Sequence, residues 1–163
     1  MPYIQYPYLP KNRSISYVPQ NDVFMVQARR QAIDHSLDKA LKTGAVVVAD
    51  GTVIGKGANG SKYHETHECE RVRLKMPSGQ GYELCEGCHP KNHAEPSAIE
   101  DAKNNGHESQ LKGASLYLWG HWWCCEPCWN AMIKAGISDV FLLEGSEWMF
   151  DRENPKNILK SAY

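Results

Sequence analysis

The chain has 163 residues, which suits one compact domain whose core needs no disulfide support. Its 18 Lys and Arg balance 19 Asp and Glu, so no strong overall field attracts a long polyanion, and a small substrate is favoured over a nucleic acid. The sequence carries neither a cationic leader nor an apolar stretch of bilayer length, so we expect a protein that is neither exported nor inserted in a membrane. Short basic runs such as Arg71-Val72-Arg73 are typical of solvated surface.

The first part of the chain predicts an arm followed by a helix. Residues 1–20 are rich in Pro and Tyr without a sustained period, which predicts an irregular arm, and residues 21–163 are expected to form a single domain. Asn21-Asp22 can cap a helix, because the apolar residues that follow recur at helical spacing to about Thr43.

A hairpin and a long loop come next. Residues 45–49 read as a buried strand and 52–57 as its return strand, because Asp50-Gly51 between them is typical of a two-residue turn. From 60 to 92 no period holds, although an untethered loop of that length is uncommon in a small domain. Since this segment contains three of the six cysteines, we expect something to tie it down.

The second half alternates between helix and strand. Helices are predicted at 96–104 and 127–135, and strands at 115–119 and 137–143. The last twenty residues predict one further helix or a partial strand. This alternation indicates a sheet flanked by helices.

Two short motifs carry the chemistry, His93-Ala94-Glu95 and Cys125-Glu126-Pro127-Cys128, and each lies where the chain enters a predicted helix. Cysteines three apart place both sulfurs on one side of a starting helical turn, where the helix N-terminus favours thiolates. Two thiolates and one neutral imidazole balance the charge of zinc and leave its fourth tetrahedral position open, as a catalytic site requires. Alone, the cysteine pair is also compatible with a redox pair or part of a structural zinc site.

The orientation of Glu95 does not follow from periodicity. On an ideal helix, the side chains of residues two apart point in directions about 200° from each other. Helical spacing alone therefore does not direct the Glu95 side chain toward a metal on His93. Pro96 disfavours helical geometry at the residue before it, which indicates that the helix starts only at Pro96. An H-x-E element followed by P-C-x-x-C is nevertheless the signature of zinc deaminases, in which the Glu acts as general acid and base.

In this order the motifs resemble the cytidine and deoxycytidylate deaminase superfamily, and its deoxycytidylate deaminase branch most closely. The match runs from about 44 to 143. The residues that carry it are Gly44-Ala45-Val46-Val47-Val48, Gly57-Ala58-Asn59-Gly60, His93-Ala94-Glu95 with Ala98-Ile99, and Cys125-x-x-Cys128 leading to Ala135-Gly136-Ile137. The resemblance implies an α/β fold, a three-layer α/β/α sandwich with a mixed five-stranded sheet, and a homo-oligomer.

The resemblance also implies the chemistry. Zinc would be held by His93, Cys125 and Cys128, Glu95 would move the protons, and Asn59 would hydrogen-bond the substrate sugar. The reaction implied is hydrolytic deamination of a small-molecule cytosine nucleotide or nucleoside, and we expect dCMP to become dUMP with release of ammonia. Zinc assists this attack because it lowers the pKa of water from about 15.7 toward about 7.

Three departures from the family pattern adjoin the expected pocket. Cys124 stands in place of a proline, Ser97 in place of an asparagine, and residues 119–123 replace a shorter threonine-containing turn. Trp122 or Trp123 could stack on the base, or the aromatic cluster could belong to the core. The alternatives are therefore a deaminase of another base or of RNA or DNA, and a noncatalytic zinc-binding protein with the same fold.

Three further cysteines lie in the long loop. Cys69, Cys85 and Cys88 have the spacing of a structural zinc site that lacks one ligand, and some deoxycytidylate deaminases resemble this chain in carrying a second zinc there. The histidines that could complete the site are His64, His67 and His89. The alternative is a set of free thiols. Two C-x-x-C pairs favour metal or redox chemistry in a reducing compartment, which predicts a cytoplasmic location.

Overall fold

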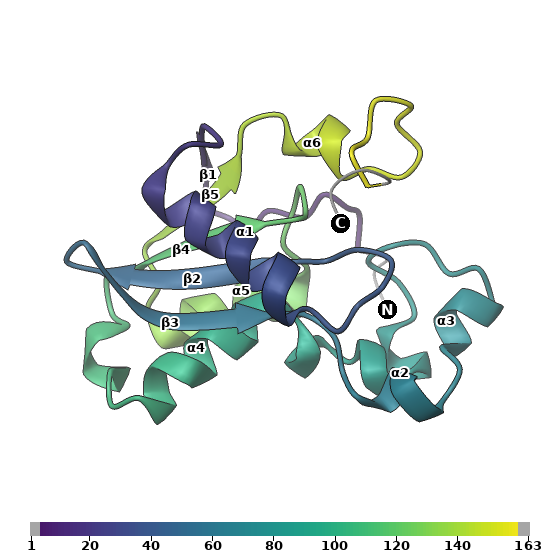
Figure 1. Ribbon diagram of the computed structural model, residues 1–163. Helices are drawn as coiled ribbons and strands as arrows, with labels where there is room; N and C mark the ends of the chain where they lie inside the picture. The colour runs from purple at the N-terminus through teal and green to yellow at the C-terminus, as the bar shows by residue number, and fades with distance from the viewer. Residues whose placement is uncertain (1–3, 160–163) are drawn as a thin grey trace.

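The computed structural model describes residues 4–159, which form one mixed five-stranded sheet with helices on both faces (Figure 1). The strands are β1 (Ile15–Val18), β2 (Gly44–Ala49), β3 (Thr52–Ala58), β4 (Ser115–Trp119) and β5 (Asp139–Leu143). The helices are α1 (Val23–His35), α2 (Tyr63–Thr66), α3 (Glu70–Arg73), α4 (Ala94–Asn104), α5 (Glu126–Ala135) and α6 (Ser146–Met149). Short 3-10 turns lie at Tyr82–Leu84, Glu86–Cys88, Pro90–Asn92 and Glu108–Gln110.

The sheet has the strand order β1-β5-β4-β2-β3. β5 pairs in parallel with β1 and β4, whereas β2 is antiparallel to both of its neighbours. Side chains alternate across β2, so Val46 and Val48 pack with α1 on one face, and Ala45 and Val47 pack with α4 and α5 on the other. The predicted three-layer α/β/α sandwich is thus confirmed.

Two glycines of β3 let α4 approach the sheet closely. A Cβ atom on Gly55 would lie 2.3 Å from the carbonyl oxygen of Ala98, and a Cβ atom on Gly57 would lie 2.4 Å from the Ala98 amide nitrogen. Glycine in a strand often marks such a close approach, because any other residue would collide with the neighbouring backbone. This contact fixes the start of α4 against the sheet, and with it the backbone of the H-x-E motif.

The N-terminal arm is less irregular than predicted. Residues 15–18 form the edge strand β1, in which Ile15 pairs with Val140 of β5. Earlier in the arm, the ring of Tyr6 stacks on Trp123 with the ring centroids 4.4 Å apart, and it also contacts Gly79, where a Cβ atom would lie 2.7 Å from the ring. A four-residue edge strand is too short to give a period, so sequence patterning misses it.

The first helix is shorter than predicted and ends at His35 rather than near Thr43. The residues that follow bind neighbouring groups in a non-helical conformation. The Ser36 hydroxyl donates to Asn59 Oδ1 (2.5 Å), and Asp38 Oδ1 accepts from the backbone amides two and three residues later (2.8 and 2.9 Å). Such short polar side chains compete with the helix for backbone hydrogen bonds, which the apolar pattern does not register.

The helix after the H-x-E motif begins at Ala94, two residues earlier than predicted, and has His93 as its N-cap. Pro96 therefore lies inside the first turn. A proline is tolerated there, because the first amides of a helix have no partner within it. The predicted start at Pro96 was wrong, because a proline within the first turn does not prevent the helix from beginning two residues earlier.

Residues 60–92 form a lobe beside the sheet, to the right in Figure 1. All of them are described, and their only regular structure is α2, α3 and short 3-10 turns. No helix among residues 4–159 is long and apolar enough to cross a membrane. Residues 1–3 of the predicted arm and 160–163 of the predicted domain lie outside the described residues.

Candidate active site

Three side chains of the predicted metal site converge at the N-terminal ends of α4 and α5. His93 Nδ1 lies 3.2 Å from Cys128 Sγ and 3.4 Å from Cys125 Sγ, and the two sulfurs are 3.1 Å apart. All three donor atoms lie within 4.8 Å of one another. The fold thus brings the two separate sequence motifs into one cluster, which we call the first cluster.

Helix capping positions hold these donors in place. His93 is the N-cap of α4, Cys125 is the N-cap of α5, and Cys128 lies in the first turn of α5. The aligned peptide dipoles of a helix favour negative charge at its N-terminus. The hydrogen bond between Cys125 and Cys128, together with the neighbouring His93, outweighs the effect of burial and lowers the pKa of the Cys125 thiol to about 5. A lowered pKa favours the thiolate, the form in which cysteine binds a metal.

The donor set of the first cluster fits zinc. Thiolate sulfur and imidazole nitrogen are its usual ligands in proteins, and the three donor atoms are near enough to share one ion. Three protein ligands leave one tetrahedral position for water, as in catalytic rather than structural sites. Tyr82 packs its ring edge-on against His93, with the centroids 4.8 Å apart, and restrains the imidazole.

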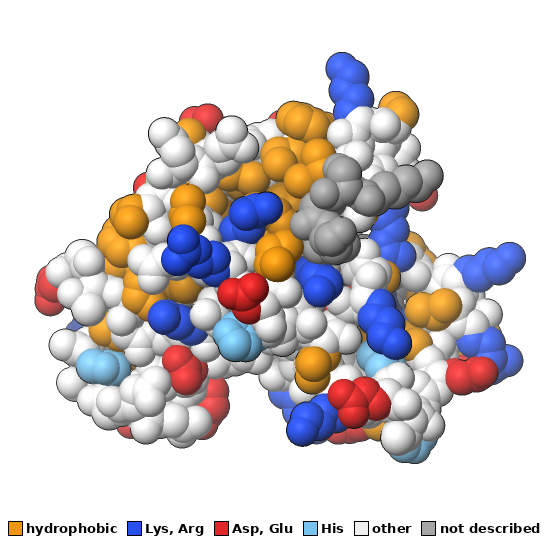
Figure 2. Space-filling model, viewed as in Figure 1, with side chains coloured by type: hydrophobic (Ala, Val, Ile, Leu, Met, Phe, Trp, Pro, Cys, Tyr) orange, Lys and Arg blue, Asp and Glu red, His pale blue; other side chains and the backbone are white. Residues whose placement is uncertain are grey.

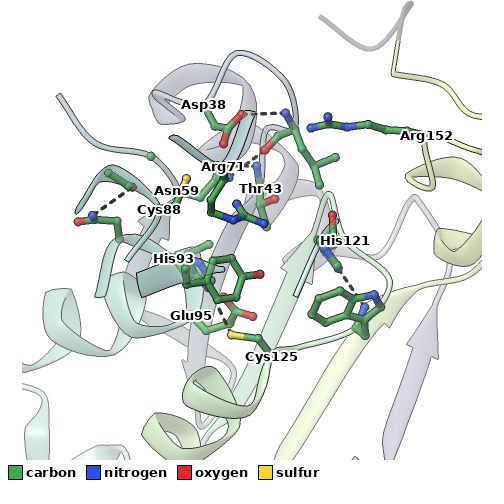
Figure 3. A pocket seen from close by; sticks show the side chains of 18 residues that line it. Asp38, Thr43, Asn59, Arg71, Cys88, His93, Glu95, His121, Cys125 and Arg152 are labelled. Carbon is green, nitrogen blue, oxygen red and sulfur yellow. Dashed lines mark hydrogen bonds between the residues drawn. The ribbon is translucent and has the colours of Figure 1, made fainter. Parts of the chain in front are cut away.

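The carboxyl group of Glu95 is buried beside the first cluster, with 5% of the residue exposed (Figure 3). Burial and the negative charge of Cys125 raise its pKa, and His93 offsets part of this rise. The thiols of Cys124 and Cys128 both hydrogen-bond the carboxyl group. Because His93 has extended backbone angles rather than helical ones, the ideal-helix argument against convergence with Glu95 does not apply.

A cavity of about 120 Å³ opens over the first cluster. In Figure 3, His93, Glu95 and Cys125 lie at one end of it, and Asp38 and Arg152 lie at the other. Trp123 also lines the cavity, whereas Trp122 packs against the two cores. Of the two tryptophans considered for stacking on a base, only Trp123 lines the cavity, and it is also a core residue whose ring stacks on Tyr6.

Asn59, the predicted sugar ligand, lies in the cavity wall. Its Oδ1 accepts hydrogen bonds from the hydroxyl of Ser36 (2.5 Å) and the amide of Thr43 (2.8 Å), and its Nδ2 donates to the carbonyl oxygen of Leu41 (2.8 Å). These bonds fix the side chain and the three segments around it. Contact between Asn59 and a sugar stays a prediction.

His121 is a cavity residue that the sequence did not single out. Burial, together with the nearby charge of His93, lowers the pKa of His121 to about 3, so the ring is neutral. Its Nδ1 accepts from the amides of Trp122 (3.0 Å) and Trp123 (3.2 Å), which leaves the ring proton on Nε2. The altered turn at 119–123 was the only sequence signal, and it did not distinguish the histidine from its aromatic neighbours.

Two arginines in the cavity wall were also missed. Arg71 donates from Nε to the carbonyl oxygen of Gln80 (2.8 Å) and from Nη2 to that of Pro77 (3.1 Å), and its guanidinium lies 4.5 Å from the ring centroid of Tyr82. Arg152 enters from the segment after α6 (Figure 3). The interpretation of the basic run as solvated surface holds for Val72 and Arg73, which are exposed, and is wrong for Arg71, because the folded lobe turns this side chain inward.

A wider groove of about 1160 Å³ adjoins the cavity and shares Asp38, Arg71 and Arg152 with it. Further basic side chains line the groove, namely Lys39, Lys42, Arg73 and Lys75. In Figure 2, Lys and Arg side chains lie beside the hollow between the sheet and the lobe. The cavity thus opens toward a groove whose lining has more basic than acidic side chains, the acidic ones being Asp38, Glu65 and Glu68.

The loop cysteines form a second cluster. Cys69, Cys85 and Cys88 lie with His64, and one donor atom from each falls within 4.8 Å of the others. Of the three histidines that the sequence left open, His64 is thus the one that the fold brings to the cysteines.

Several solved structures match this chain at low similarity. The diaminohydroxyphosphoribosylaminopyrimidine deaminase/5-amino-6-(5-phosphoribosylamino)uracil reductase of Thermotoga maritima is 26% identical with a TM-score of 0.44, over 73% of this chain and 28% of that one. Guanine deaminase from Bacillus subtilis is 23% identical with a TM-score of 0.46, over 78% and 69%. The dCMP deaminase of cyanophage S-TIM5 is 20% identical with a TM-score of 0.49, over 85% and 88%.

The chain spans between 26% and 28% of the length of the first three solved structures that it matches. No curated protein sequence matches it. Residues 19–144, well over half of the chain, match the family model for the cytidine and deoxycytidylate deaminase zinc-binding region. This range contains the first cluster and Glu95. The chain therefore belongs to the zinc-binding cytidine and deoxycytidylate deaminase family.

Proposed function

We propose that this protein is a zinc-dependent hydrolytic deaminase of a cytosine nucleotide, with dCMP as its expected substrate. The observation that carries the proposal is the buried carboxyl group of Glu95 beside a three-donor cluster in one small cavity. Deamination needs an activated water and a group that moves protons at the same carbon atom. These residues supply a place for both.

His93, Cys125 and Cys128 would hold the zinc ion at the inner end of the cavity. Bound there, zinc would supply a water whose pKa is lowered toward neutrality, and so a competent nucleophile. The edge contact from Tyr82 would keep the His93 ring in its ligating orientation.

Glu95 would take the proton of the attacking water, pass it to ring nitrogen N3, and then protonate the departing amine. The C4–O bond forms, the C4–N bond breaks, ammonia leaves and uracil remains. Burial raises the pKa of Glu95, which suits a group that must accept and return a proton near neutral pH. The thiol of Cys124, which hydrogen-bonds the carboxyl group, would help to orient it.

The remaining cavity side chains suit a nucleotide. Trp123 would contact the base, His121 Nε2–H can donate to an oxygen of the base or sugar, and Asn59 would contact the sugar. Arg71 and Arg152 also line the cavity. Since guanidinium groups match phosphate geometry, this pair favours a monophosphate over a nucleoside.

The groove supports a second candidate, a deaminase that acts on a cytosine within RNA or DNA. Its volume of about 1160 Å³ exceeds that of the cavity, and basic side chains such as Lys39 and Lys75 line it, where successive phosphates would lie. The near-neutral net charge of the whole chain favours the small substrate.

Two further expectations accompany the proposal. The family resemblance supports a homo-oligomer, which sedimentation of the purified protein would test. The two C-x-x-C pairs support a reducing, cytoplasmic compartment, which localisation of the tagged protein would test.

Ammonia release from a substrate panel tests the proposal. The panel contains cytosine, cytidine, deoxycytidine, their mono- and triphosphates, guanine, adenosine, and single-stranded RNA and DNA. We expect dCMP to be deaminated with the highest kcat/KM. Preference for an oligonucleotide would establish the second candidate, and preference for a purine would overturn both. A zinc-loaded protein that releases no ammonia from any member would be a noncatalytic zinc-binding protein.

A further inference from the structure

The N-terminal arm reaches the wall of the cavity through Tyr6. This side chain is half-buried and packs against the core that contains Trp123. The two rings stack with their centroids 4.4 Å apart and their planes 29° from parallel. Because Trp123 lines the cavity, Tyr6 lies one side chain behind the expected binding site of the base.

The ring of Tyr6 also contacts the lobe, at Gly79. A Cβ atom on Gly79 would lie 2.7 Å from Tyr6 Cδ2 and 3.0 Å from Trp123 Cη2. The φ angle of Gly79 is +86°, in the region that favours glycine, so its backbone angle and its neighbours both disfavour a side chain there. Tyr6, Gly79 and Trp123 thus form one close contact between the arm, the lobe and the loop after β4.

The hydroxyl of Tyr6 reaches the start of α5. Burial raises the pKa of this hydroxyl, and a hydrogen bond from the backbone amide of Glu126 offsets part of the rise. Glu126 lies in the first turn of α5, directly after Cys125. The arm therefore contacts three segments that carry cavity residues, namely the loop after β4, the start of α5 and the lobe.

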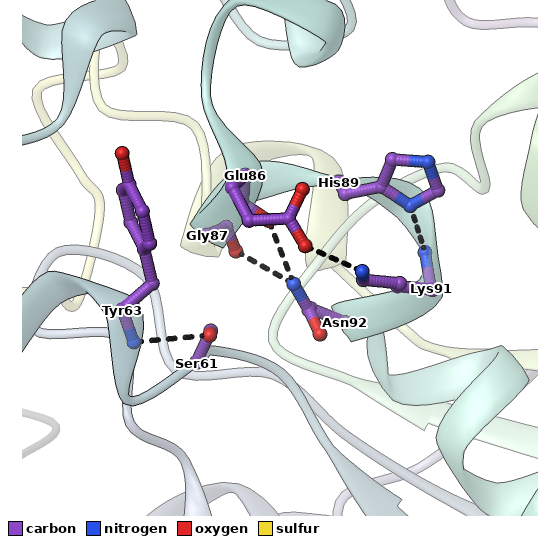
Figure 4. A network of polar contacts seen from close by, with 7 residues as sticks. All are labelled: Ser61, Tyr63, Glu86, Gly87, His89, Lys91 and Asn92. Carbon is purple, nitrogen blue, oxygen red and sulfur yellow. Dashed lines mark hydrogen bonds and ion pairs between the residues drawn. The ribbon is translucent and has the colours of Figure 1, made fainter.

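The base of the lobe has supports of its own. Asn92 Nδ2 donates to the carbonyl oxygens of Glu86 (3.0 Å) and Gly87 (3.2 Å; Figure 4), and the carbonyl oxygen of Asn92 accepts from the amide of Gly60 (3.0 Å). The second cluster, where the family resemblance implies a structural zinc ion, lies in the same part of the lobe. Both supports lie outside residues 70–84.

Residues 70–84 form the outer part of the lobe and have little packing of their own. None of them is buried, and the apolar side chains of Val72, Leu74 and Leu84 are exposed. A segment with so few buried contacts opens locally at low cost in free energy. The contact between Gly79 and Tyr6 joins this segment to the rest of the protein.

We propose that Tyr6 is a positioning residue, which holds Trp123 and the turn at 77–80 in place as two walls of the substrate cavity. Its effect on substrate binding rests on the proposed function, whereas its effect on the two walls does not. Trp123 belongs to one wall, and Ser78 of the turn belongs to the other.

The loss of the Tyr6 ring should weaken binding without changing the chemical step. Trp123 would lose its stacking partner and the turn would lose its neighbour, so both would sample further conformations. Only molecules with both walls in place bind substrate well, and the apparent affinity falls with their fraction. Glu95 and the first cluster are held by α4 and α5, so they should keep their arrangement.

Hydrogen exchange tests the two walls without reference to turnover. Tyr6→Ala should speed the exchange of backbone amides in residues 77–80 and 121–124 about three- to tenfold, the factor that corresponds to the loss of one aromatic pair. The amides of Trp122 and Trp123 donate to His121 Nδ1 (3.0 and 3.2 Å), so their exchange reports on the loop after β4. Mass spectrometry of peptic fragments resolves both segments.

Tyr8→Ala is the matched control for exchange, because Tyr8 lies in the same arm and packs against the same core. It should leave both segments at their wild-type rates. Tyr6→Leu keeps apolar volume without the stacked ring, and it replaces Tyr6→Ala if that variant fails to fold. Wild-type exchange in the Tyr6 variant, or equal acceleration in Tyr8→Ala, would overturn the positioning role.

Kinetics with dCMP test the effect on substrate binding. Tyr6→Ala should raise KM about three- to tenfold and leave kcat and zinc content near those of the wild type. Tyr6→Phe, which keeps the ring, should keep KM close to the wild-type value. A fall in kcat without a change in KM, or a Tyr6→Phe variant as impaired as Tyr6→Ala, would overturn the effect on binding. If no member of the panel is deaminated, the proposed function fails, and the exchange rates still decide whether Tyr6 holds the two walls.

Discussion

The two clusters of donor side chains are held in different ways. His93, Cys125 and Cys128 sit at the N-termini of α4 and α5, on a sheet whose core is fully packed. The second cluster lies in a lobe with two buried residues and no strand. The first has three donors beside a cavity, and the second has four.

This difference relates the number of donor side chains in each cluster to the rigidity of the structure that carries it. A site with an open position must keep its geometry without a fourth protein ligand, so rigid helix ends and a packed core are needed to hold it. A closed site can itself act as the scaffold, because all four ligands belong to the segment that it folds. The two clusters should therefore respond differently to the loss of one ligand.

The largest effect is expected from Cys128→Ala. This change removes a donor from the first cluster, so the catalytic zinc should be lost. Turnover should then fall more than about 10⁴-fold, which is the upper end of the range for loss of an acid–base group. The lobe zinc should stay. Cys124→Ala is the matched control for zinc content, since Cys124 is adjacent but lies outside the cluster. Full zinc content in Cys128→Ala would move the catalytic site elsewhere.

Glu95→Gln should have the next largest effect. The amide cannot carry the proton, so turnover should fall about 10²- to 10⁴-fold. Both zinc ions should remain, because the change leaves both donor sets intact. Elemental analysis and ammonia release on the same sample check this split between metal and activity. Near-normal turnover would remove Glu95 from its assigned role.

Limited proteolysis should separate the two scaffolds. In Cys85→Ser, trypsin should cleave the lobe at Lys62, Arg71, Arg73 and Lys75 about tenfold faster or more, because the segment opens locally without its metal. In Cys128→Ala the same bonds should stay protected, since the lobe keeps its own zinc. Mass spectrometry of the first fragments reports the sites. Early cleavage within the sheet of the Cys85→Ser protein would contradict the view that the lobe opens independently.

The smallest expected effect concerns His121 and pH. Burial lowers its pKa to about 3, so between pH 6.5 and 3 the unfolded chain takes up a proton that the folded chain does not. The contribution of the neutral His121 ring to the free energy of unfolding is therefore complete above pH 6.5. It decreases as the pH falls, by up to about 1.4 kcal/mol per pH unit. His121→Asn, whose Oδ1 can accept the same amides, should show a shallower decline between pH 7 and 5 in urea unfolding. Equal slopes in both proteins would show that His121 is protonated in the fold.

Local signals explain which parts could be predicted. Apolar periodicity and turn residues predicted a sheet flanked by helices, and the family resemblance implied the five-stranded sandwich. His93, Cys125 and Cys128 followed from two motifs with short, fixed spacing, whereas the role of Glu95 came from the resemblance. Such spacing survives folding because each motif occupies a single helical turn. The end of α1 was missed because it depends on the hydrogen bond from the Ser36 hydroxyl to Asn59, a residue 23 positions later in the chain.

The positions of side chains in the lobe could not be predicted from the sequence. The sequence gives no reason to choose among His64, His67 and His89. Only the folded turn at Gly87, which contacts the His64 ring, distinguishes this histidine from the other two. Arg71 belongs to a short basic run, and its inward direction depends on the carbonyl oxygens of Gln80 and Pro77. A segment folded around its ligands has no periodic pattern from which such contacts could be inferred.

The stacking of Tyr6 has a consequence for the order of folding. Its ring needs Trp123 and Gly79 in place at the same time, so this part of the chain can dock only after Trp123, more than a hundred residues later, is ordered. Contacts of such long sequence separation form slowly, because closing the chain costs entropy before the contact forms. We therefore expect the arm to join after the folding transition state. Tyr6→Ala should then accelerate unfolding in stopped-flow experiments while the refolding rate stays unchanged, and a slowed refolding rate would place the arm in the nucleus instead.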